Sequence, residues 1–561
     1  MKEMMTRWLT DPAVDDQTRA EVASVAGNEE EILSRFGSRL SFGTAGLRGI
    51  IGAGTNRMNI YVVRQATQGL ADLILSIGSD AAARGVVVGH DCRILSREFA
   101  VESCRVLVAN GIKAYLFDEL RPTPEVSFAI RDLNCIAGIN ITASHNPKEY
   151  NGYKAYWEDG AQLSLEQADV VYASICATDI FNGVKVASME EFETKTVLLA
   201  KDYDDRFLEK VLDCRVNPAV ITRQKDMSIV YTPLHGTGYR LVPEVLRRAG
   251  FENVTCVPSQ MVLSGEFPTV ALPNPEYKDS FIDAMKLADE RGADFIIGTD
   301  PDADRVGVVV RRSDGEFEAL SGNQTGALLL DYILRARKET GNLPANAAAV
   351  KSIVSTEMTT AICRKYGVTM FNVLTGFKFI GEKIKEFEAD QSHTYVFGFE
   401  ESYGYLTGTY ARDKDAVAAS LMVSEMAAYY REKGMTLADA MDALYAEYGV
   451  YVEKTVSIAM KGVDAPEKMR SLMEGLRSSR PETFAGIPVE SVYDLEKGAM
   501  GLPPSNVLYY RLTDGSVLVV RPSGTEPKVK IYVMVSAETR PAAEQKAENL
   551  RAAFFAFAGI E

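Results

Sequence analysis

The chain has 561 residues, of which 46% are hydrophobic and 25% are charged, and its formal net charge is -16. This length exceeds one hydrophobic core and predicts about three to five domains of ordinary globular composition. The acidic excess excludes long-range attraction to nucleic acid or to an anionic membrane surface, so an anionic ligand must be bound by local cations. We therefore expect neither nucleic acid nor a membrane as a partner.

The cysteines and the first residues of the chain indicate a cellular compartment. Seven cysteines are scattered without a C-x-x-C pair, which argues against a disulfide framework and against a zinc site. The first twenty residues, "MKEMMTRWLTDPAVDDQTRA", lack the apolar core of a signal peptide, and no apolar run approaches the ~18 residues of a membrane span. These features predict a soluble, cytoplasmic protein.

One order of elements (strand, helix, strand, helix, strand) is predicted three times, over 85–142, 228–298 and 347–398. Such alternation indicates α/β layers, in which ligands gather at the carboxyl ends of strands. Each third strand runs into a polar segment: "CIAGINIT" into Ser144, "DFIIG" into "TDPDADR", and "TYVFG" into "FEESYG". One cleft can therefore collect all three segments.

The pattern changes after about residue 445, where alternating apolar residues and two helices predict a smaller α+β domain. "TDG" at 513–515 lies between apolar runs and predicts a hairpin turn. We expect four domains, at 1–205, 206–320, 321–445 and 446–561.

"DPDADR" places Asp300, Asp302 and Asp304 at alternate positions, which point the same way in an extended loop. Three converging carboxylates fit a hard cation, with Mg²⁺ as the natural candidate. An EF-hand is excluded because Arg305 stands where that loop requires Gly and Arg311 stands where it requires Glu. An acidic surface turn is the alternative.

"RPSGTEPK" gathers a cation, hydroxyls and a glycine at 521–528, a composition that suits a phosphate cradle. The alternative is a hairpin tip in which Gly and Pro only form the turn. In "FGTAGLRG", Arg48 either meets a phosphate or ends a loop. In "FGFEESYG", Glu400 and Ser402 suit sugar hydroxyls, although a solvated acidic turn is the equal alternative.

"TASHNPKEYNGYK", at 142–154, offers Ser144 as a nucleophile, a phosphate acceptor or a helix cap. The cap is the poorest of these because the turn-rich residues that follow make a poor helix start. His145 and His235 lack the contexts of a hydrolase triad or a zinc protease, and a lone His is more often a structural hydrogen bonder. Lys154 either reaches a phosphate or is an ordinary exposed lysine.

These four segments, in this order and across nearly the whole chain, resemble those of the α-D-phosphohexomutase family. "TASHNP" is similar to its phosphoserine loop, "DPDADR" to its magnesium loop, "GFEESYG" to its sugar loop and "RPSGTEPK" to its phosphate-binding loop. The resemblance implies an α/β fold of three related α/β domains with mixed sheets between helices, plus a smaller C-terminal α+β domain, around a central cleft.

The resemblance also implies roles for individual residues. The implied catalytic residues are Ser144, His145, Lys154 and Arg48. The implied Mg²⁺ ligands are Ser144, Asp300, Asp302 and Asp304. The implied substrate-binding residues are Arg305, Lys378 in "TGFKFIG", Glu400, Ser402, Arg521, Ser523, Gly524 and Thr525, with Lys351 as a weaker match.

The activity that the resemblance implies is an intramolecular phosphotransfer, with Mg²⁺ as cofactor and glucose 1,6-bisphosphate as activator and intermediate. Phosphoserine gives its phosphoryl group to glucose 1-phosphate, the bisphosphate turns in the cleft, and Ser144 takes the other phosphoryl group back. "EES" followed by an aromatic residue and Gly is similar to glucose-type members, and the serine loop to long bacterial phosphoglucomutases.

Four alternatives stay open at this point: phosphomannomutase activity, phosphopentomutase activity, a non-catalytic phosphosugar-binding regulator, and a metal-dependent phosphatase with an Asp nucleophile. We expect a phosphosugar substrate and a monomer or weak homodimer.

Overall fold

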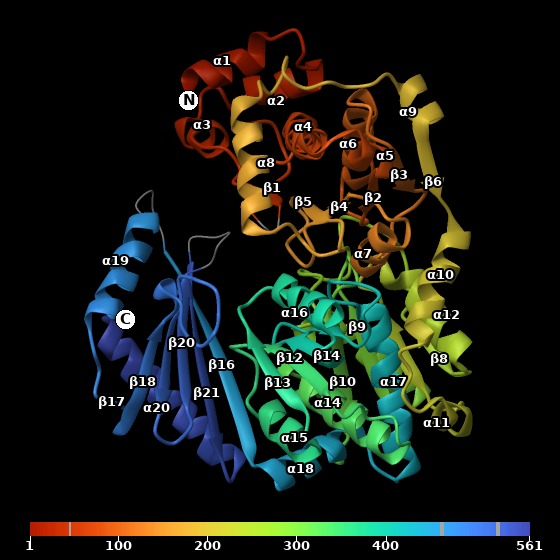
Figure 1. Ribbon diagram of the computed structural model, residues 1–561, viewed down its shortest axis with the longest axis vertical. Coiled ribbons are helices and arrows are strands. Elements are labelled where there is room, and N and C mark those ends of the chain that lie inside the picture. Colours follow the sequence, from red (N-terminus) through yellow and green to blue (C-terminus); the bar gives the residue numbers. More distant parts are fainter. Residues whose placement is uncertain (44–45, 461–464, 523–527, 561) are drawn as a thin grey trace.

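The computed structural model describes residues 1–43, 46–460, 465–522 and 528–560, without the side chain of residue 466. Three α/β units and one C-terminal unit make up this part of the chain (Figure 1). The first unit lies at the top of the view, the second and third pack together below it, and the C-terminal unit stands beside them. The predicted fold class is confirmed.

The first unit runs from α1 to β6 around a six-stranded mixed sheet in the order β1-β5-β4-β2-β3-β6. Strands β2, β3, β4 and β6 are parallel, and β5 runs antiparallel between β4 and β1. Its strands are β1 (Leu47–Ile50), β2 (Val86–His90), β3 (Ala114–Phe117), β4 (Ala137–Ile141), β5 (Tyr150–Trp157) and β6 (Thr196–Leu199). Its helices are α1 (Lys2–Thr10), α2 (Asp16–Val25), α3 (Glu29–Phe36), α4 (Ile60–Ile77), α5 (Ser79–Arg84), α6 (Ser96–Ala109), α7 (Thr123–Asp132), α8 (Leu165–Ala177) and α9 (Met189–Lys195).

The second unit contains a five-stranded mixed sheet in the order β11-β10-β9-β7-β8. Its strands are β7 (Ile229–Thr232), β8 (Val254–Cys256), β9 (Phe295–Thr299), β10 (Val306–Arg311) and β11 (Phe317–Leu320). Its helices are α10 (Lys201–Leu212), α11 (Pro218–Arg223), α12 (Gly238–Ala249), the short 3-10 helix η1 (Lys278–Phe281) and α13 (Ile282–Arg291).

The third unit contains a four-stranded mixed sheet in the order β13-β12-β14-β15. Its strands are β12 (Ala347–Ser352), β13 (Thr369–Val373), β14 (Thr394–Glu400) and β15 (Gly404–Leu406). Its helices are α14 (Gly322–Glu339), α15 (Met358–Tyr366), α16 (Phe377–Asp390), α17 (Ala416–Glu432) and α18 (Leu437–Tyr448).

The C-terminal unit is an antiparallel sheet in the order β16-β21-β20-β19-β18-β17 with helices packed against it. Its strands are β16 (Val450–Ala459), β17 (Thr483–Phe484), β18 (Ile487–Asp494), β19 (Leu508–Leu512), β20 (Val517–Pro522) and β21 (Lys528–Ala537). Its helices are α19 (Ala465–Ser478), η2 (Leu495–Lys497) and α20 (Arg540–Ala558). The predicted turn at 513–515 joins the antiparallel pair β19 and β20, so that prediction is confirmed.

The three α/β units repeat one topology. In each, a central strand (β2, β7 or β12) pairs in parallel with the two strands that follow it in the chain. The second of these then pairs with an antiparallel strand (β5, β10 or β15). The connections between these last two strands carry Ser144, the aspartate triplet and the segment 401–403. The threefold repeat therefore delivers the predicted loops at equivalent positions.

Helix α17 explains how the second and third units hold together. Its side chains are buried on nearly every face, and it packs on α11 and α12 of the second unit and on α14 and β15 of the third. Its N-terminus is capped by Asp415, whose side chain accepts a hydrogen bond from the backbone N–H of Ala418 at 2.9 Å. A helix that is apolar all round must be enclosed by protein.

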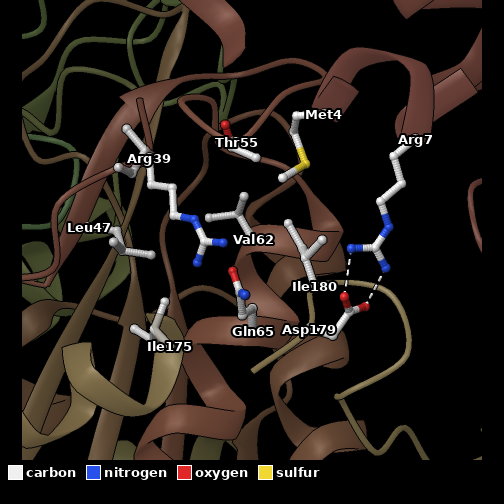
Figure 2. Close-up of a pocket in the computed structure, with 11 residues that line it drawn as sticks. Met4, Arg7, Arg39, Leu47, Thr55, Val62, Gln65, Ile175, Asp179 and Ile180 are labelled. Carbon is white, nitrogen blue, oxygen red and sulfur yellow. Dashed lines mark hydrogen bonds and ion pairs between the residues drawn. The ribbon is translucent and has the colours of Figure 1, made fainter. Parts of the chain in front are cut away.

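Helices α1 to α3 pack on the outside of the first unit. Trp8 is fully buried and meets Phe36, Tyr61 and Phe181 edge to face, with ring centroids 5.3–5.9 Å apart. Figure 2 shows a small pocket at this junction, into which Arg39 and Gln65 point and beside which Arg7 pairs with Asp179. Its volume of about 40 Å³ leaves room for little more than water.

The expected domain limits at 205 and 445 fall inside α10 and α18, and that at 320 falls at the end of β11. The division of the chain at these three positions stays a prediction. Among the described helices, none combines the length and the apolar character that crossing a bilayer requires.

Candidate active site

The serine loop begins where β4 ends. Ser144 is almost fully buried, and its backbone N–H donates to Thr142 Oγ1 at 2.9 Å. The Ser144 hydroxyl donates to Asp300 Oδ2 at 2.8 Å and lies 3.2 Å from His145 Nδ1. The sequence-predicted nucleophile therefore meets both an imidazole and the aspartate loop.

The aspartate loop closes on itself around Asp300. Asp300 Oδ1 accepts hydrogen bonds from the backbone N–H groups of Asp304, at 3.1 Å, and Arg305, at 3.0 Å. Gly236, which precedes α12, packs so closely on this loop that a Cβ there would lie 2.3 Å from Pro301 Cα. The loop is thus fixed by its own hydrogen bonds to Asp300 and by the close packing of Gly236 on Pro301.

Each of the three equivalent loops contains a residue other than glycine in the left-handed region of backbone space. These are Ser144 with φ 53°, Ala303 with φ 50° and Tyr403 with φ 68°. A side chain in this region costs roughly 1–3 kcal/mol and persists where surrounding contacts determine the conformation. Because such strained residues cluster at functional sites, their presence in all three loops indicates that the three loops form one site.

Two lysines meet the aspartates. Lys154, on β5, lies 2.6 Å from Asp302 Oδ2 and 3.1 Å from Asp304 Oδ2. Lys414, in the segment before α17, lies 3.2 Å from Asp304 Oδ2 and 2.9 Å from Asp413 Oδ1. All these groups are buried, so the charge of each lysine and of each aspartate is stabilised mainly by its charged neighbours and not by water.

The three aspartates fit a divalent cation. One carboxylate oxygen from each lies within 4.8 Å of the others. Asp302 Oδ1 and Asp304 Oδ1 are buried without a hydrogen-bond partner, a condition that costs about 1–3 kcal/mol for each group. Burial and the other two carboxylates raise the pKa of Asp300 well above its usual value. A hard cation bound by oxygen ligands would relieve all of these costs.

The electrostatics assign different proton states to His145 and Lys154. Burial, together with the charges of Arg305 and Arg48, lowers the pKa of His145 well below its usual value, so its imidazole is neutral. Burial opposes the charge of Lys154 as well, but Asp302 and Asp304 outweigh it and raise the pKa of that lysine. His145 can accept a proton, and Lys154 stays a cation.

A cleft of about 760 Å³ opens above the serine loop, and all four units line it. The first unit contributes Arg48 and His145, the second contributes Arg305, and the C-terminal unit contributes Arg521. The third unit contributes Glu400 and Ser402, the predicted sugar contacts. Glu400 Oε1 accepts a hydrogen bond from the Gly376 backbone at 2.7 Å, which fixes its carboxylate at the wall.

Other predicted residues take different positions. Lys154 and the aspartates are buried and are not among the described residues that line the cleft. Lys378 is not among them either: its Nζ lies 4.7 Å from the ring centre of Phe379. Lys351 is buried and pairs with Glu357 at 2.9 Å. Ser523, Gly524 and Thr525 lie outside the described residues.

His235 takes the structural role expected of a lone histidine. Its Nδ1 lies 2.7 Å from Val262 O, and its Nε2 lies 2.9 Å from Thr269 Oγ1.

Sequence reasoning missed four residues around the site. Thr123, at the start of α7, donates its hydroxyl to Asp302 Oδ2 at 2.8 Å and its N–H to the Asp302 carbonyl at 2.8 Å. Glu276 lines the cleft and binds Arg305 at 2.6 Å. Lys414 and Arg93 are the other two. The alternating charges of "RDKD" at 412–415, in a segment between apolar runs, could have indicated Lys414.

Comparison with known families agrees with this geometry. Residues 39–180, 205–315 and 321–448 match the three alpha/beta/alpha domains of the phosphoglucomutase/phosphomannomutase family, and residues 476–553 match its C-terminal domain. The chain belongs to this family. It is accordingly a phosphohexomutase, an enzyme that transfers a phosphoryl group within phosphosugars.

Individual relatives cover almost the whole chain. The phosphoglucomutase of Staphylococcus haemolyticus strain JCSC1435 is 36% identical over 521 residues, which are 90% of this chain and 91% of that protein.

Two solved structures share the fold. Paramecium pp63/parafusin, a phosphoglucomutase in its open form, has a TM-score of 0.69 at 19% identity and covers 93% of this chain and 96% of its own. A phosphoglucomutase/phosphomannomutase family protein from Burkholderia thailandensis has a TM-score of 0.68 at 18% identity, with 92% and 97% covered.

Proposed function

We propose that this phosphohexomutase interconverts glucose 1-phosphate and glucose 6-phosphate through a phosphorylated Ser144 and a bound glucose 1,6-bisphosphate. The observation that carries the proposal is the cleft lined by all four units. His145, Asn146 and Pro147 line it, and Ser144, which directly precedes them, is hydrogen-bonded to Asp300. Such a cleft suits a sugar that carries a phosphate at each end.

In the first half of the reaction, the bond between phosphorus and Ser144 Oγ breaks and a bond to the 6-hydroxyl of glucose 1-phosphate forms. The 6-hydroxyl proton needs an acceptor, and we assign it to the neutral imidazole of His145. His145 Nδ1 lies 3.2 Å from Ser144 Oγ, so the imidazole can pass a proton to that oxygen as its bond to phosphorus breaks. Lys154 keeps its positive charge close to the reacting atoms. Mg²⁺ held by Asp300, Asp302, Asp304 and Ser144 would neutralise charge on the transferred oxygens.

In the second half, the bisphosphate has turned and presents its 1-phosphoryl group to Ser144. Oγ attacks the phosphorus, and the bond between that phosphorus and O1 of the sugar breaks. The proton that Oγ loses passes through the His145 imidazole to O1, and glucose 6-phosphate is released. Turning requires a distal site that accepts either phosphate. Arg521, with Ser523, Gly524 and Thr525, is our proposal for that site, because an arginine fork binds phosphate without reading the sugar.

Glucose is the proposed sugar because Glu400 and Ser402 offer a fixed carboxylate and a hydroxyl at the cleft wall. Both groups can bind vicinal sugar hydroxyls. The relatives named phosphoglucomutase support the same assignment.

The test is a coupled assay on the 1-phosphates of glucose, mannose, glucosamine and ribose, with Mg²⁺ and a trace of the matching bisphosphate. We expect the highest kcat/KM for glucose 1-phosphate and mass-spectrometric phosphorylation of Ser144. Mannose or ribose in first place would replace the proposed substrate. Release of inorganic phosphate that survives Ser144→Ala would favour a phosphatase, and binding without turnover would favour a regulator.

A further inference from the structure

We propose that Arg93 is a positioning residue that fixes the backbone of Ser144 for phosphoryl transfer, and that Phe267 of the second unit holds this arginine in place. The proposal rests on the proposed role of Ser144 as the residue that carries the phosphoryl group. Arg93 itself does not line the cleft, among the residues described there, so it acts through the loop.

The Arg93 guanidinium forms four hydrogen bonds to backbone carbonyls of the serine loop. Its Nη2 donates to Ser144 O at 2.6 Å and to Asn146 O at 2.5 Å. Its Nη1 donates to Pro147 O at 2.8 Å and to Tyr150 O at 2.9 Å. Only the planar, five-donor fork of arginine can serve four carbonyls from one buried point.

Asp91 completes the arrangement. The side chains of Asp91 and Arg93 are both fully buried, with Arg93 Nε 3.3 Å from Asp91 Oδ2. Asp91 Oδ1 accepts a hydrogen bond from the Arg93 backbone at 2.8 Å and another from Ser96 Oγ at 2.7 Å. The carboxylate of Asp91 therefore compensates the charge of Arg93 on the Nε side, and the Nη1 and Nη2 donors of Arg93 are directed to the serine loop.

These bonds matter because Ser144 has φ 53°, a conformation that its own side chain disfavours. The carbonyl of Ser144 is tied to Arg93, while its N–H is tied to Thr142 Oγ1. Together the two bonds hold the peptide groups on both sides of the strained residue. The direction of Oγ toward Asp300 follows from this backbone.

A segment of the second unit covers Arg93 from the other side. The Phe267 ring centre lies 5.1 Å from the Arg93 guanidinium carbon. Gly265 approaches so closely that a Cβ there would lie 2.6 Å from the backbone nitrogen of Ile94. The same segment, between β8 and η1, continues to Glu276, which binds Arg305 at the cleft. It therefore links the serine loop to the cleft wall.

The decisive variant is Arg93→Lys, which keeps the charge and loses the fork. The measurement is the single-turnover phosphorylation of Ser144 by glucose 1,6-bisphosphate, followed by mass spectrometry, together with the bisphosphate Kd by calorimetry. We expect the rate to fall roughly 100-fold, as for a displacement of about 1 Å, with Kd within about threefold of the wild-type value. Added guanidinium should restore part of the rate in Arg93→Gly.

The matched control is Glu266→Gln on the same segment. Glu266 pairs with Lys148 of the serine loop at 2.7 Å, but the two side chains are 58% and 50% exposed, so the variant should keep the wild-type rate. Phe267→Leu keeps the fork and removes the ring, and we expect its rate to fall about five- to tenfold. This second variant decides the matter if Arg93→Lys does not fold.

A wild-type rate in Arg93→Lys, or in Phe267→Leu where the lysine variant fails to fold, overturns the positioning role. Loss of affinity equal to the loss of rate also overturns it, because that pattern belongs to a substrate-binding residue. Failure of the wild-type protein to phosphorylate Ser144 overturns the proposed function instead.

Discussion

The hydroxyl of Ser144 donates a 2.8 Å hydrogen bond to Asp300 across 156 positions of the sequence. The two residues follow equivalent strands, β4 and β9, of two repeated units. Both loops contain a residue in the left-handed region of backbone space: Ser144 itself in the first, and Ala303, three residues after Asp300, in the second. The contact brings a nucleophile to a carboxylate whose pKa is raised by burial and by its own neighbours. A cation at the aspartates would therefore act directly beside the serine.

The first prediction concerns this serine. Ser144→Ala should lower turnover at least about a thousandfold, because a residue that carries the transferred group cannot be bypassed. Affinity for glucose 1,6-bisphosphate should change little, since the buried hydroxyl offers little binding surface. Steady-state kinetics and calorimetry measure the two effects. Comparable turnover in the variant would contradict the assignment.

A second prediction concerns Thr123, which reaches from α7 to the aspartate loop. Thr123→Val keeps the shape and removes the hydroxyl that donates to Asp302 Oδ2. Hydrogen bonds that orient metal ligands are typically worth about 10- to 100-fold in metal affinity, so the Mg²⁺ concentration for half-maximal activity should rise by about that factor. Thr123→Ser retains the hydroxyl and serves as the control. Identical Mg²⁺ dependence in the valine variant and the control would exclude this role.

Much of the fold was predictable because each α/β unit contains short apolar runs that are followed by polar segments, a pattern typical of buried strands with functional loops. "CIAGINIT" before Ser144 and "DFIIG" before Asp300 are both short apolar runs, and both became parallel strands with their loops at one edge. The limits between units stay a prediction. The expected limits at 205 and 445 fall inside α10 and α18, and a continuous helix has no Gly- or Pro-rich signal to mark a junction.

The site residues that the sequence did not reveal were missed for one physical reason: their contacts depend on the folded backbone. Arg93 binds backbone carbonyls, and carbonyls have no residue-type signature in a sequence. Lys414 meets Asp304 only because the segment before α17 folds back onto the aspartate loop. Lys378 stays a prediction as a substrate-binding residue: the motif gave its position in the chain, whereas the structure places its Nζ 4.7 Å from the ring centre of Phe379. Side-chain direction depends on tertiary packing that a motif does not encode.

A third prediction concerns the distal phosphate. Arg521 lines the cleft on β20, and Arg521→Ala should raise KM and lower kcat, each roughly tenfold or more, because distal binding energy aligns the reacting end. Arg511→Ala is the matched control, since Arg511 lies on neighbouring β19 with a side chain that is 54% exposed. Unchanged kinetics in the Arg521 variant, or equal losses in both variants, would remove Arg521 from the phosphate site.

The last prediction concerns pH and the junction between the third and C-terminal units. Glu453, on β16, lines the cleft, and its Oε1 is buried without a hydrogen-bond partner. Burial raises the pKa of Glu453 to about 7. Between its ordinary pKa and about 7, the folded protein keeps a proton that the unfolded chain has lost. The free energy of unfolding therefore falls as pH rises through this window.

Glu453→Gln removes that dependence, because the amide is neutral at every pH. The variant should match the wild-type protein near pH 4.5 and become more stable than it by about 1–3 kcal/mol above pH 7, because each pKa unit between 4.5 and about 7 corresponds to 1.36 kcal/mol. Melting temperatures of both proteins from pH 5 to 8 measure the effect. A difference that stays constant across this range, or one that shrinks as pH rises, would show that Glu453 is ionised throughout and that the carboxylate is solvated at the cleft wall.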